Sequence, residues 1–322
     1  MGARHDLVGL VRKLLSESGF AVSERYTVRP ISFDMIARRD SLLLVLKVLG
    51  NADALNDRVA QELRILSKFL NATPLLVAER SGSGLLEDGV VYSHRGVRVL
   101  TSGTLRDHLV DNAPPMAFAS PGGLFVHLRS EMLRNLRAQR ALSLGLLAEV
   151  AGVSRRAIQM YEEGMRATIE SALRLEEYLK ASLVEPIDPF TPLADFLEES
   201  KVSEPAKLLG QFEASVMEML RSVGFRVVPT QQSPFNALTQ ATKSSTILTG
   251  VERRDPQDQE RARLLTSVRA VTETQSMYVV NRDTERTDVH GTPIVQRSEL
   301  EKLRDPDELQ RLLRERRKKD PA

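Results

Sequence analysis

The stretch LRNLRAQRALSLGLLAEVAGVSRRAIQMYEEGMRATIESALRLEEYL, residues 133–179, decides the fold of the central part of this chain. Leu133 and Leu136 stand one helical turn apart among Arg, Asn and Gln, which predicts a first helix with a single apolar stripe. Ser143 is placed to cap a short, mostly apolar second helix. The spacing therefore predicts helices that pack through apolar faces.

A tight turn and a third helix follow. Gly152 supplies the turn, and Ser154 is placed to cap the helix. Ile158 and Tyr161 share the buried face of this third helix. Its outward positions near the N-terminal end are Arg155, Arg156 and Gln159. Such side chains can bond guanine, phosphate or adenine edges in a major groove, so the pattern indicates a helix-turn-helix reader of double-stranded DNA.

This segment resembles the helix-turn-helix domain of the lambda repressor and Cro superfamily. The residues that carry the resemblance, in family order, are Leu133, Leu136, Leu142, Ser143, Leu147, Ala148, Gly152, Val153, Ser154, Ile158, Tyr161, Glu162 and Gly164. The resemblance implies that the base readers are Arg155, Arg156 and Gln159. It also implies DNA contacts from Ser143, Ser154 and Arg166. One position departs from the pattern, because Leu144 stands where the second helix usually opens with a Gln that braces a phosphate.

A plainer interpretation is a small packing module whose arginines are merely solvated. Phosphate contacts alone would give affinity without sequence preference, so specificity depends on the side chains that reach base edges. The basic tail Arg311 to Lys319 could add nonspecific phosphate affinity, or could be a solvated helix end.

Length and composition predict an intracellular protein with two or three domains. The chain has 322 residues and a formal charge of +2, so DNA-binding charge must be local. The absence of Cys excludes disulfides and cysteine zinc sites, and the five His show no metal-binding spacing. No apolar run approaches the ~20 residues that span a membrane, and the start MGARHDLVGL resembles no signal peptide. We expect a cytoplasmic protein without cofactor or metal.

Runs rich in Pro and Gly predict the domain boundaries. The expected parts are an α/β domain at 1–112, a linker at 113–124, the helix-turn-helix domain at 125–184, a linker at 185–194 and a second α/β domain at 195–317. The predicted fold class is therefore multidomain, with a central all-α bundle between two mixed α/β domains.

The first of these domains alternates helix and strand. The expected elements are a helix at 7–15 closed by Gly19, strands at 20–28, 34–38 and 42–49, a helix through Val59, Leu63 and Leu66, and a strand at 74–78. Residues 42–49 are apolar on both faces, as in a central buried strand. Lys47 is the exception, and must either reach the surface or find an anionic partner.

This arrangement resembles the restriction-endonuclease-like fold, particularly archaeal Holliday-junction resolvases. The family's site is an Asp followed by (Asp or Glu)-x-Lys, which Asp34 and Lys47 match, but the second acid position is Val45. The match of Asp6 to a helix carboxylate found in some resolvases is loose. Too few carboxylates remain to hold Mg²⁺, so we expect no nuclease activity unless relocated acids such as Asp53 or Asp57 restore it.

The last domain repeats the first. Gly224-Phe225 follows a helix as Gly19-Phe20 does, and Asn236 stands where the first copy has Asp34. Thirteen positions separate Asp34 from Lys47 and also Asn236 from Thr249, which predicts that Thr249 replaces the lysine. Both catalytic side chains would then be lost from this copy.

The whole chain resembles a family of archaeal helix-turn-helix transcriptional regulators. We expect a sequence-specific regulator that inserts the helix at 154–163 into the major groove. Its two flanking domains would pair with each other within one chain or between two chains, and so assemble a homodimer. Alternatively, they would bind an effector. The alternatives are a structure-specific nuclease related to resolvases, and a non-catalytic scaffold that recruits proteins and is anchored on DNA.

Overall fold

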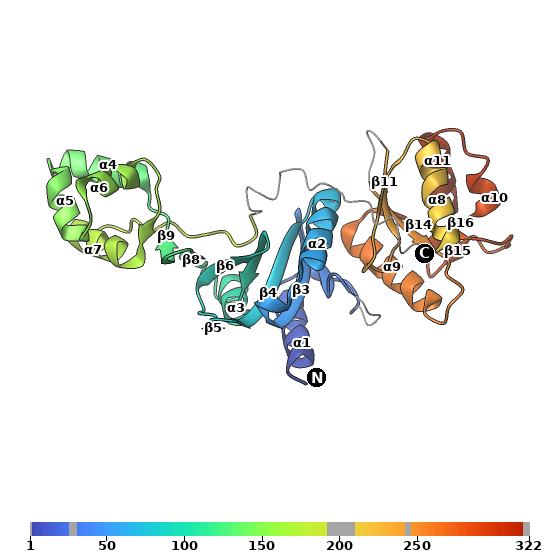
Figure 1. Cartoon of the computed structure of the whole chain (residues 1–322), viewed down its shortest axis with the longest axis horizontal. Helices are drawn as coiled ribbons and strands as arrows, with labels where there is room; N and C mark the ends of the chain where they lie inside the picture. Colours follow the sequence, from blue (N-terminus) through green and yellow to red (C-terminus); the bar gives the residue numbers. More distant parts are fainter. Residues whose placement is uncertain (1, 26–30, 192–209, 242–245, 318–322) are drawn as a thin grey trace. The chain divides into compact units, whose positions relative to one another are not determined.

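The computed structural model describes residues 2–25, 31–191, 210–241 and 246–317 (Figure 1). The chain divides into two compact units. Unit 1 comprises Met1–Val48, Leu55–Leu75 and Pro192–Ala322, and unit 2 comprises Leu49–Ala54 and Leu76–Thr191. Residues 192–209, which include the end of the predicted second linker and the start of the predicted last domain, lie outside the described residues.

The first half of unit 1 has the predicted order of helix, strands, helix and strand. Its elements are α1 (Gly2–Glu17), β1 (Ala21–Val22), β2 (Met35–Arg39), β3 (Leu42–Asn51), α2 (Asp57–Leu70) and the beginning of β4 (Thr73–Ser81). Strands β1, β2 and β3 pair antiparallel in that order. The Asn56 side chain caps α2 by accepting from Val59 N, and Asn71 ends it at φ 51°. The predicted strand at 20–28 is shorter than expected, and residues 26–30 are outside the described part.

The second half of unit 1 repeats this order. Its elements are α8 (Gln211–Ser222), β11 (Arg226–Pro229), β12 (Ala237–Gln240), β13 (Ile247–Val251), α9 (Asp258–Thr272), β14 (Gln275–Val280), β15 (Asp288–Val289), β16 (Thr292–Gln296), α10 (Arg297–Leu300) and α11 (Pro306–Arg317). The sheet order is β11-β12-β13-β14-β16-β15, with β13, β14 and β16 mutually parallel. Its core includes Val216, Phe225, Ile247, Met277 and Leu309.

Reciprocal contacts join the two halves of unit 1. Glu62 on α2 accepts from Gln232 N at 3.1 Å and from Ser233 Oγ at 2.7 Å, in the loop between β11 and β12. In return, Arg263 on α9 pairs at 3.3 Å with Glu24, which lies between β1 and β2. The corresponding helices α2 and α9 therefore each contact the loop between the first two strands of the other half. This reciprocal arrangement is the pattern of a twofold dimer interface.

Unit 2 contains the rest of the first α/β region and the central helices. Its elements are the 3-10 helix η1 (Ala52–Ala54), the remainder of β4, β5 (Gly84–Leu85), β6 (Val90–His94), β7 (Val97–Leu100), α3 (Ser102–Leu109), β8 (Ala117–Ser120), β9 (Gly123–Val126), α4 (Ser130–Gln139), α5 (Leu144–Ala151), α6 (Arg155–Glu162), β10 (Ala167–Thr168) and α7 (Ile169–Leu179). Strands follow one another in the order β7-β6-β8-β9-β10.

The segment 113–124, predicted as a linker, contains β-strand structure. It carries β8 and the start of β9, with Gly122 and Gly123 at φ 100° and 132° in the turn between them. β8 pairs parallel with β6, and β9 pairs antiparallel with β10. These partners come from distant parts of the sequence, so the local Pro and Gly content could not reveal the strands.

The second predicted linker is also anchored where it is described. Glu185 N donates to His127 O at 2.9 Å, and Ile187 N donates to Pro115 O at 2.8 Å. Over the described residues, the helices include none with both the length and the apolar character needed to cross a membrane.

Candidate nucleic-acid interface

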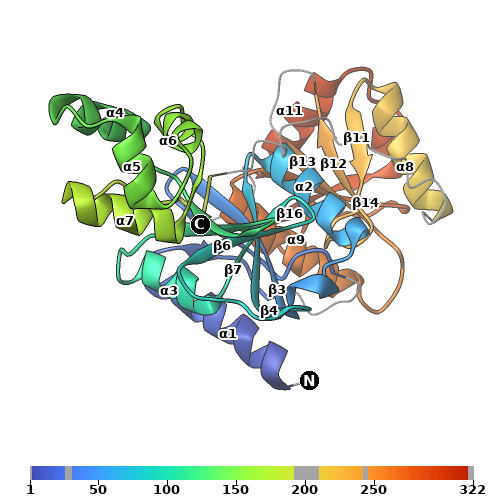
Figure 2. The same ribbon diagram turned by 60° about the vertical axis from the view of Figure 1, so that its left-hand side comes forward.

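The predicted caps and turn organise helices α4 to α7 (Figure 2). Ser143 Oγ accepts from Leu146 N at 3.1 Å and begins α5, and Ser154 Oγ accepts from Ala157 N at 3.1 Å and begins α6. Gly152 lies between the two helices at φ 69°, a left-handed conformation that other residues adopt at a cost. The three predictions about these positions are confirmed.

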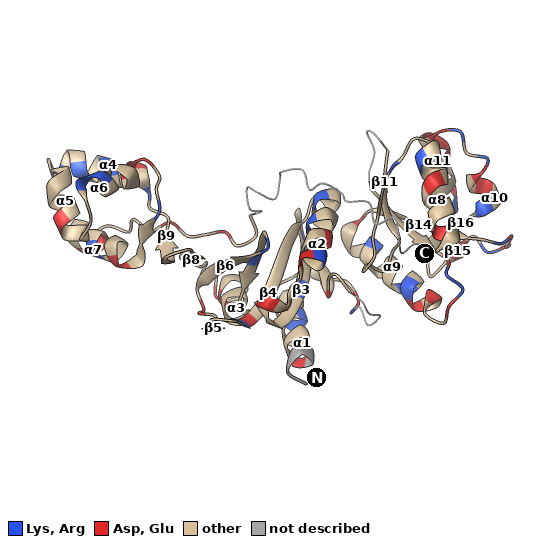
Figure 3. Cartoon of the chain, viewed as in Figure 1, with Lys and Arg blue, Asp and Glu red and all other residues tan. Residues whose placement is uncertain are grey.

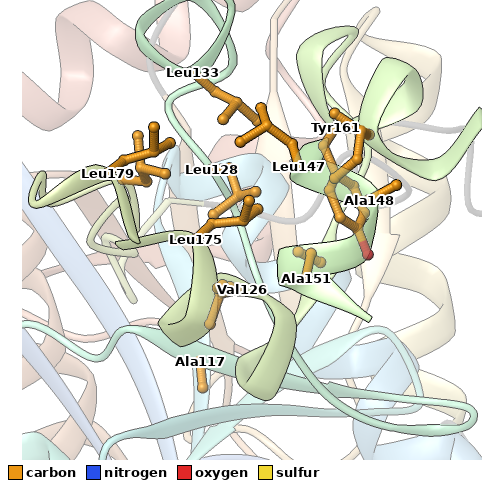
Figure 4. Close-up of a cluster of buried hydrophobic side chains, with 14 of the residues drawn as sticks. Ala117, Val126, Leu128, Leu133, Leu147, Ala148, Ala151, Tyr161, Leu175 and Leu179 are labelled. Carbon is orange, nitrogen blue, oxygen red and sulfur yellow. The ribbon is translucent and has the colours of Figure 1, made fainter. Parts of the chain in front are cut away.

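A continuous apolar core fixes α6 against its neighbours (Figure 4). Ile158 and Tyr161 are buried as predicted. Around them lie Leu133, Leu147, Ala148, Ala151, Leu175 and Leu179, together with Val90, Ala117 and Val126 from strands β6, β8 and β9. The helical core therefore continues into the sheet of unit 2, which makes the helix-turn-helix part of that unit rather than a separate bundle.

The predicted base-reading side chains all lie on the exposed face of α6. Arg155, Arg156 and Gln159 are exposed, and Gln159 Nε2 donates to Glu163 Oε1 at 3.3 Å. A Cβ on Gly145 would stand 3.1 Å from Arg155 Nε, so that guanidinium lies close over the start of α5. Figure 3 shows the Lys and Arg positions gathered along α4 and α6.

The remaining predicted contacts surround this face. Ser143 and Ser154 are exposed although each hydroxyl already caps a helix. Arg166 follows α6, and its guanidinium carbon lies 4.4 Å from the centroid of the Phe125 ring on β9. This cation–π contact restricts an otherwise flexible exposed side chain.

Sequence reasoning missed an ion pair that anchors the C-terminal end of α6. Arg137 on α4 donates to both carboxylate oxygens of the buried Glu162, at 2.5 and 3.0 Å. This hydrogen bonding raises the pKa of Arg137 above its ordinary value. Arg134 Nη2 also donates to Glu162 O at 2.6 Å, and Ser130 Oγ donates to Tyr161 O at 2.6 Å. Together they satisfy carbonyls that the helix end leaves open.

The nuclease-like positions of the first half form a buried, electrically balanced centre. Lys47 is buried and has an anionic partner rather than reaching the surface. Its Nζ lies 3.5 Å from Asp34 Oδ2 and donates to Ile31 O at 2.7 Å. Asp34 Oδ2 also accepts from Val48 N at 2.8 Å. Val45 is completely buried, so an apolar side chain fills the position of the second acid.

The other acids considered do not complete a metal site. Asp6 is exposed on α1, Asp57 opens α2, and Asp53 accepts from Gly82 N within unit 2. Throughout the described ranges, no three His, Cys, Asp or Glu side chains are gathered as metal ligands.

The strand register corrects one prediction about the second half. Met35 pairs with Leu46, eleven positions on, whereas Ala237 pairs with Thr249, twelve positions on. Asp34 N donates to Leu46 O and Asn236 N donates to Thr249 O, so Thr249 corresponds to Leu46. The counterpart of Lys47 is therefore Gly250, and the prediction of Thr249 was wrong because the second hairpin is one residue longer.

Asn236 occupies the same place as Asp34 but in a different charge environment. Its Oδ1 accepts from Val251 N at 2.8 Å, repeating the bond from Val48 N to Asp34. Its Nδ2 donates to the buried Glu213 on α8, which also accepts from Arg253 Nε. The sequence comparison did not single out Glu213 or Arg253, because both are distant in sequence from Asn236.

Two family models match separate parts of the chain. Residues 4–115 match a PD-(D/E)XK superfamily domain, and residues 133–185 match a helix-turn-helix. These matches agree with the mixed α/β sheets and with the helices of unit 2. No solved structure matches the chain.

Archaeal proteins match almost the full length. A protein of Natronomonas pharaonis is 40% identical over 98% of this chain and 99% of its own length. A protein of Methanosarcina acetivorans is 37% identical over 97% of both chains, and one of Halorubrum lacusprofundi is 37% identical over 98% of both. All three carry the name "Putative HTH-type transcriptional regulatory protein". Its helix-turn-helix carries exposed basic and amide side chains on α6, and the chain belongs to this archaeal family of DNA-binding HTH-type transcriptional regulators.

Proposed function

We propose that the protein reads a specific DNA sequence with Arg155, Arg156 and Gln159 of α6 in the major groove. The observation that carries the proposal is their common exposure on the N-terminal part of a helix fixed at both ends, by Ser154 and by Arg137 with Glu162. Ser143, Ser154 and Arg166 would contact phosphates around the groove and set the orientation of the helix.

Selection of bound fragments from genomic DNA at near-physiological salt tests this reading. The intact protein is expected to recover one motif, and the variant Arg155→Ala/Arg156→Ala is expected to lose it. Each bidentate Arg–guanine contact contributes about 1–3 kcal/mol of discrimination. Arg106→Ala, on the exposed surface of α3, is the matched control and should leave the motif unchanged. Motif-free binding by the intact protein would contradict the proposal.

We also propose that the two halves of unit 1 form a nuclease-like pair within one chain. The reciprocal contacts of α2 and α9 support this pairing, as do the hydrogen bonds of Ser32 N and Oγ to Gln232 O, at 2.7 and 2.9 Å. The faces that nuclease-like subunits would otherwise offer to another chain are then already occupied. A homodimer needs a different surface.

That surface is the outer face of α7. Leu173 and Tyr178 are 56% and 42% exposed there, although both are large and partly or wholly apolar. Arg174 and Glu177 lie on the same face and are exposed. When two copies of α7 cross antiparallel about a twofold axis, Leu173 meets Tyr178 of the other copy and Arg174 meets Glu177. A dimer formed in this way would present two recognition helices to a pseudo-palindrome.

The oligomeric state of the full chain tests whether a second copy of the chain binds the outer face of α7. Sedimentation equilibrium should show a dimer that Leu173→Glu dissociates. Exchanging the charges in Arg174→Glu/Glu177→Arg should retain it, because the pairs reform across the axis. Leu85→Glu, at a highly exposed apolar residue of β5, is the control and should remain dimeric. A monomeric wild-type protein, or a dimer insensitive to Leu173→Glu, would refute the α7 interface.

The PD-(D/E)XK match makes a nuclease the second candidate. We propose that this chemistry is lost, because Val45 fills the position of the second acid and Lys47 is held by Asp34 and Ile31 O. Incubation with duplex, junction and single-stranded DNA plus Mg²⁺ or Mn²⁺ should leave every substrate intact. Metal-dependent cleavage that Asp34→Asn abolishes would reinstate the nuclease.

A further inference from the structure

A cavity of about 670 Å³ lies in unit 1, beside the centre built on Asn236. Its walls come from both halves of the unit: the start of α2, the start of α8, the loop before β12 and the residues that follow β13. This volume is within the range of small-molecule sites. The cavity belongs to neither the recognition helix nor the Asp34–Lys47 centre.

The acidic side chains of the wall are already neutralised. Glu213 accepts from Asn236 and Arg253 through Oε1, and from Gly210 N at 3.0 Å through Oε2. Glu252 pairs with Arg282 at 3.2 Å and lies 3.8 Å from Arg254 Nε. These carboxylates therefore contribute little negative potential to the space they line.

Two arginines leave donors for a ligand. Arg58 is exposed on the first turn of α2 and forms no hydrogen bond or ion pair with any residue in the described ranges. Arg253 binds Glu213 through Nε alone, and its side chain is 40% exposed. A guanidinium can bond two oxygens of one phosphate, which gives both affinity and orientation. The side chains of Gln231 and Gln232 add neutral polar groups to the same wall.

We propose that this cavity binds a phosphorylated small molecule of about mononucleotide size, with its phosphate between Arg58 and Arg253. The two arginines come from different halves of unit 1, so the ligand bridges the intrachain pair. The volume exceeds that of inorganic phosphate, which leaves space for the organic part of an ester beside Phe212 and the two glutamines.

Calorimetric titration of the full chain with inorganic phosphate, adenosine 5′-monophosphate and adenosine tests the proposal. Phosphate and the monophosphate should each bind saturably at one site, and adenosine should not bind. Arg58→Gln should lower the affinity for the monophosphate about tenfold, as expected for the loss of a charged hydrogen-bonding partner. Lys68→Gln removes an exposed charge from the other end of α2 and should have no effect.

The DNA-reading variant separates this site from the DNA interface. Arg155→Ala/Arg156→Ala should bind the monophosphate as the wild type does, whatever its effect on DNA. The proposal fails if neither phosphate-bearing probe binds at millimolar concentration, or if Arg58→Gln and Lys68→Gln weaken binding equally. Arg58-dependent binding of a single-stranded oligonucleotide that is tighter than binding of the monophosphate would overturn the small-molecule assignment in favour of a nucleic-acid backbone.

Discussion

The centres at Asp34 and Asn236 have the same backbone geometry but different charge chemistry. In both, one side-chain oxygen accepts from a strand N–H at 2.8 Å, from Val48 in the first half and from Val251 in the second. The first centre balances a carboxylate with Lys47. The second uses a neutral amide, with Glu213 and Arg253 as a separate ion pair beside it.

Both nuclease-motif positions therefore have a structural role in addition to any chemistry. A side-chain acceptor at 34 or 236 satisfies a buried backbone N–H whether or not a metal was ever bound nearby. Charge balance is then achieved locally by different partners. The Asp of such a motif is therefore weak evidence for catalysis when the second acid is missing.

The largest effect is expected at Asp34. Asp34→Ala removes the carboxylate that balances the buried Lys47 and accepts from Val48 N, so the free energy of unfolding should fall by about 3–5 kcal/mol. Urea denaturation measures the change. Asp34→Ala/Lys47→Met should recover much of the loss, because the uncompensated charge is also removed. An Asp34→Ala variant as stable as the wild type would contradict the claim that the Asp34 carboxylate balances the charge of buried Lys47.

Asn236→Ala should cost less, about 1–3 kcal/mol, because it leaves polar groups unpaired but no charge without a partner. The same denaturation series measures it. Glu213 keeps Arg253 as its counter-ion in this variant. A loss larger than that of Asp34→Ala would show that charge balance is not the distinction between the two centres.

The free energy of unfolding should depend on pH through Asp258, which lies in the second half of unit 1. Burial raises the pKa of Asp258 at the start of α9, but donation from Arg253 N, Arg261 and Tyr278 outweighs it and holds the pKa below its ordinary value. The stabilisation is therefore present above the unfolded-state pKa of about 3.9 and is lost as pH falls through the lower folded-state pKa. Stability of Asp258→Asn, measured from pH 6 down to about pH 2, should decline less steeply than that of the wild type. Parallel curves would contradict this assignment.

The smallest effect is expected from making the two first helices more alike. Gly9 of α1 corresponds to Ala214 of α8 when both are counted back from the turn glycines Gly19 and Gly224. A Cβ at Gly9 would have no heavy atom within 4 Å. Gly9→Ala should therefore raise the free energy of unfolding by about 0.5–1 kcal/mol, read as an increase in melting temperature. A decrease would mean that α1 needs the glycine for another reason.

Local features of the helix-turn-helix could be predicted from sequence because their causes are local. The caps at Ser143 and Ser154 and the left-handed turn at Gly152 involve residues at most four positions apart. The buried face of α6 likewise follows from helical periodicity. The base-reading roles of its exposed side chains remain predictions.

Other features depend on residues that only folding brings together. The hairpin at 117–126 is held in place because β8 pairs with β6 and β9 pairs with β10. The ion pair between Arg137 and Glu162 joins two different helices, α4 and α6. The spacing of thirteen residues suggested that Thr249 replaces Lys47, yet the longer hairpin assigns that place to Gly250.

The sequence by itself determined where α5 and α6 begin, the turn at Gly152 and the loss of the second acid at Val45, because these depend on residue type and near neighbours. Only the tertiary structure decided that Asp34 neutralises Lys47, that Glu213 and Arg253 flank Asn236, and that the halves of unit 1 pair through α2 and α9. Strand register and long-range charge pairing are set by the packing of distant segments, which no local pattern encodes.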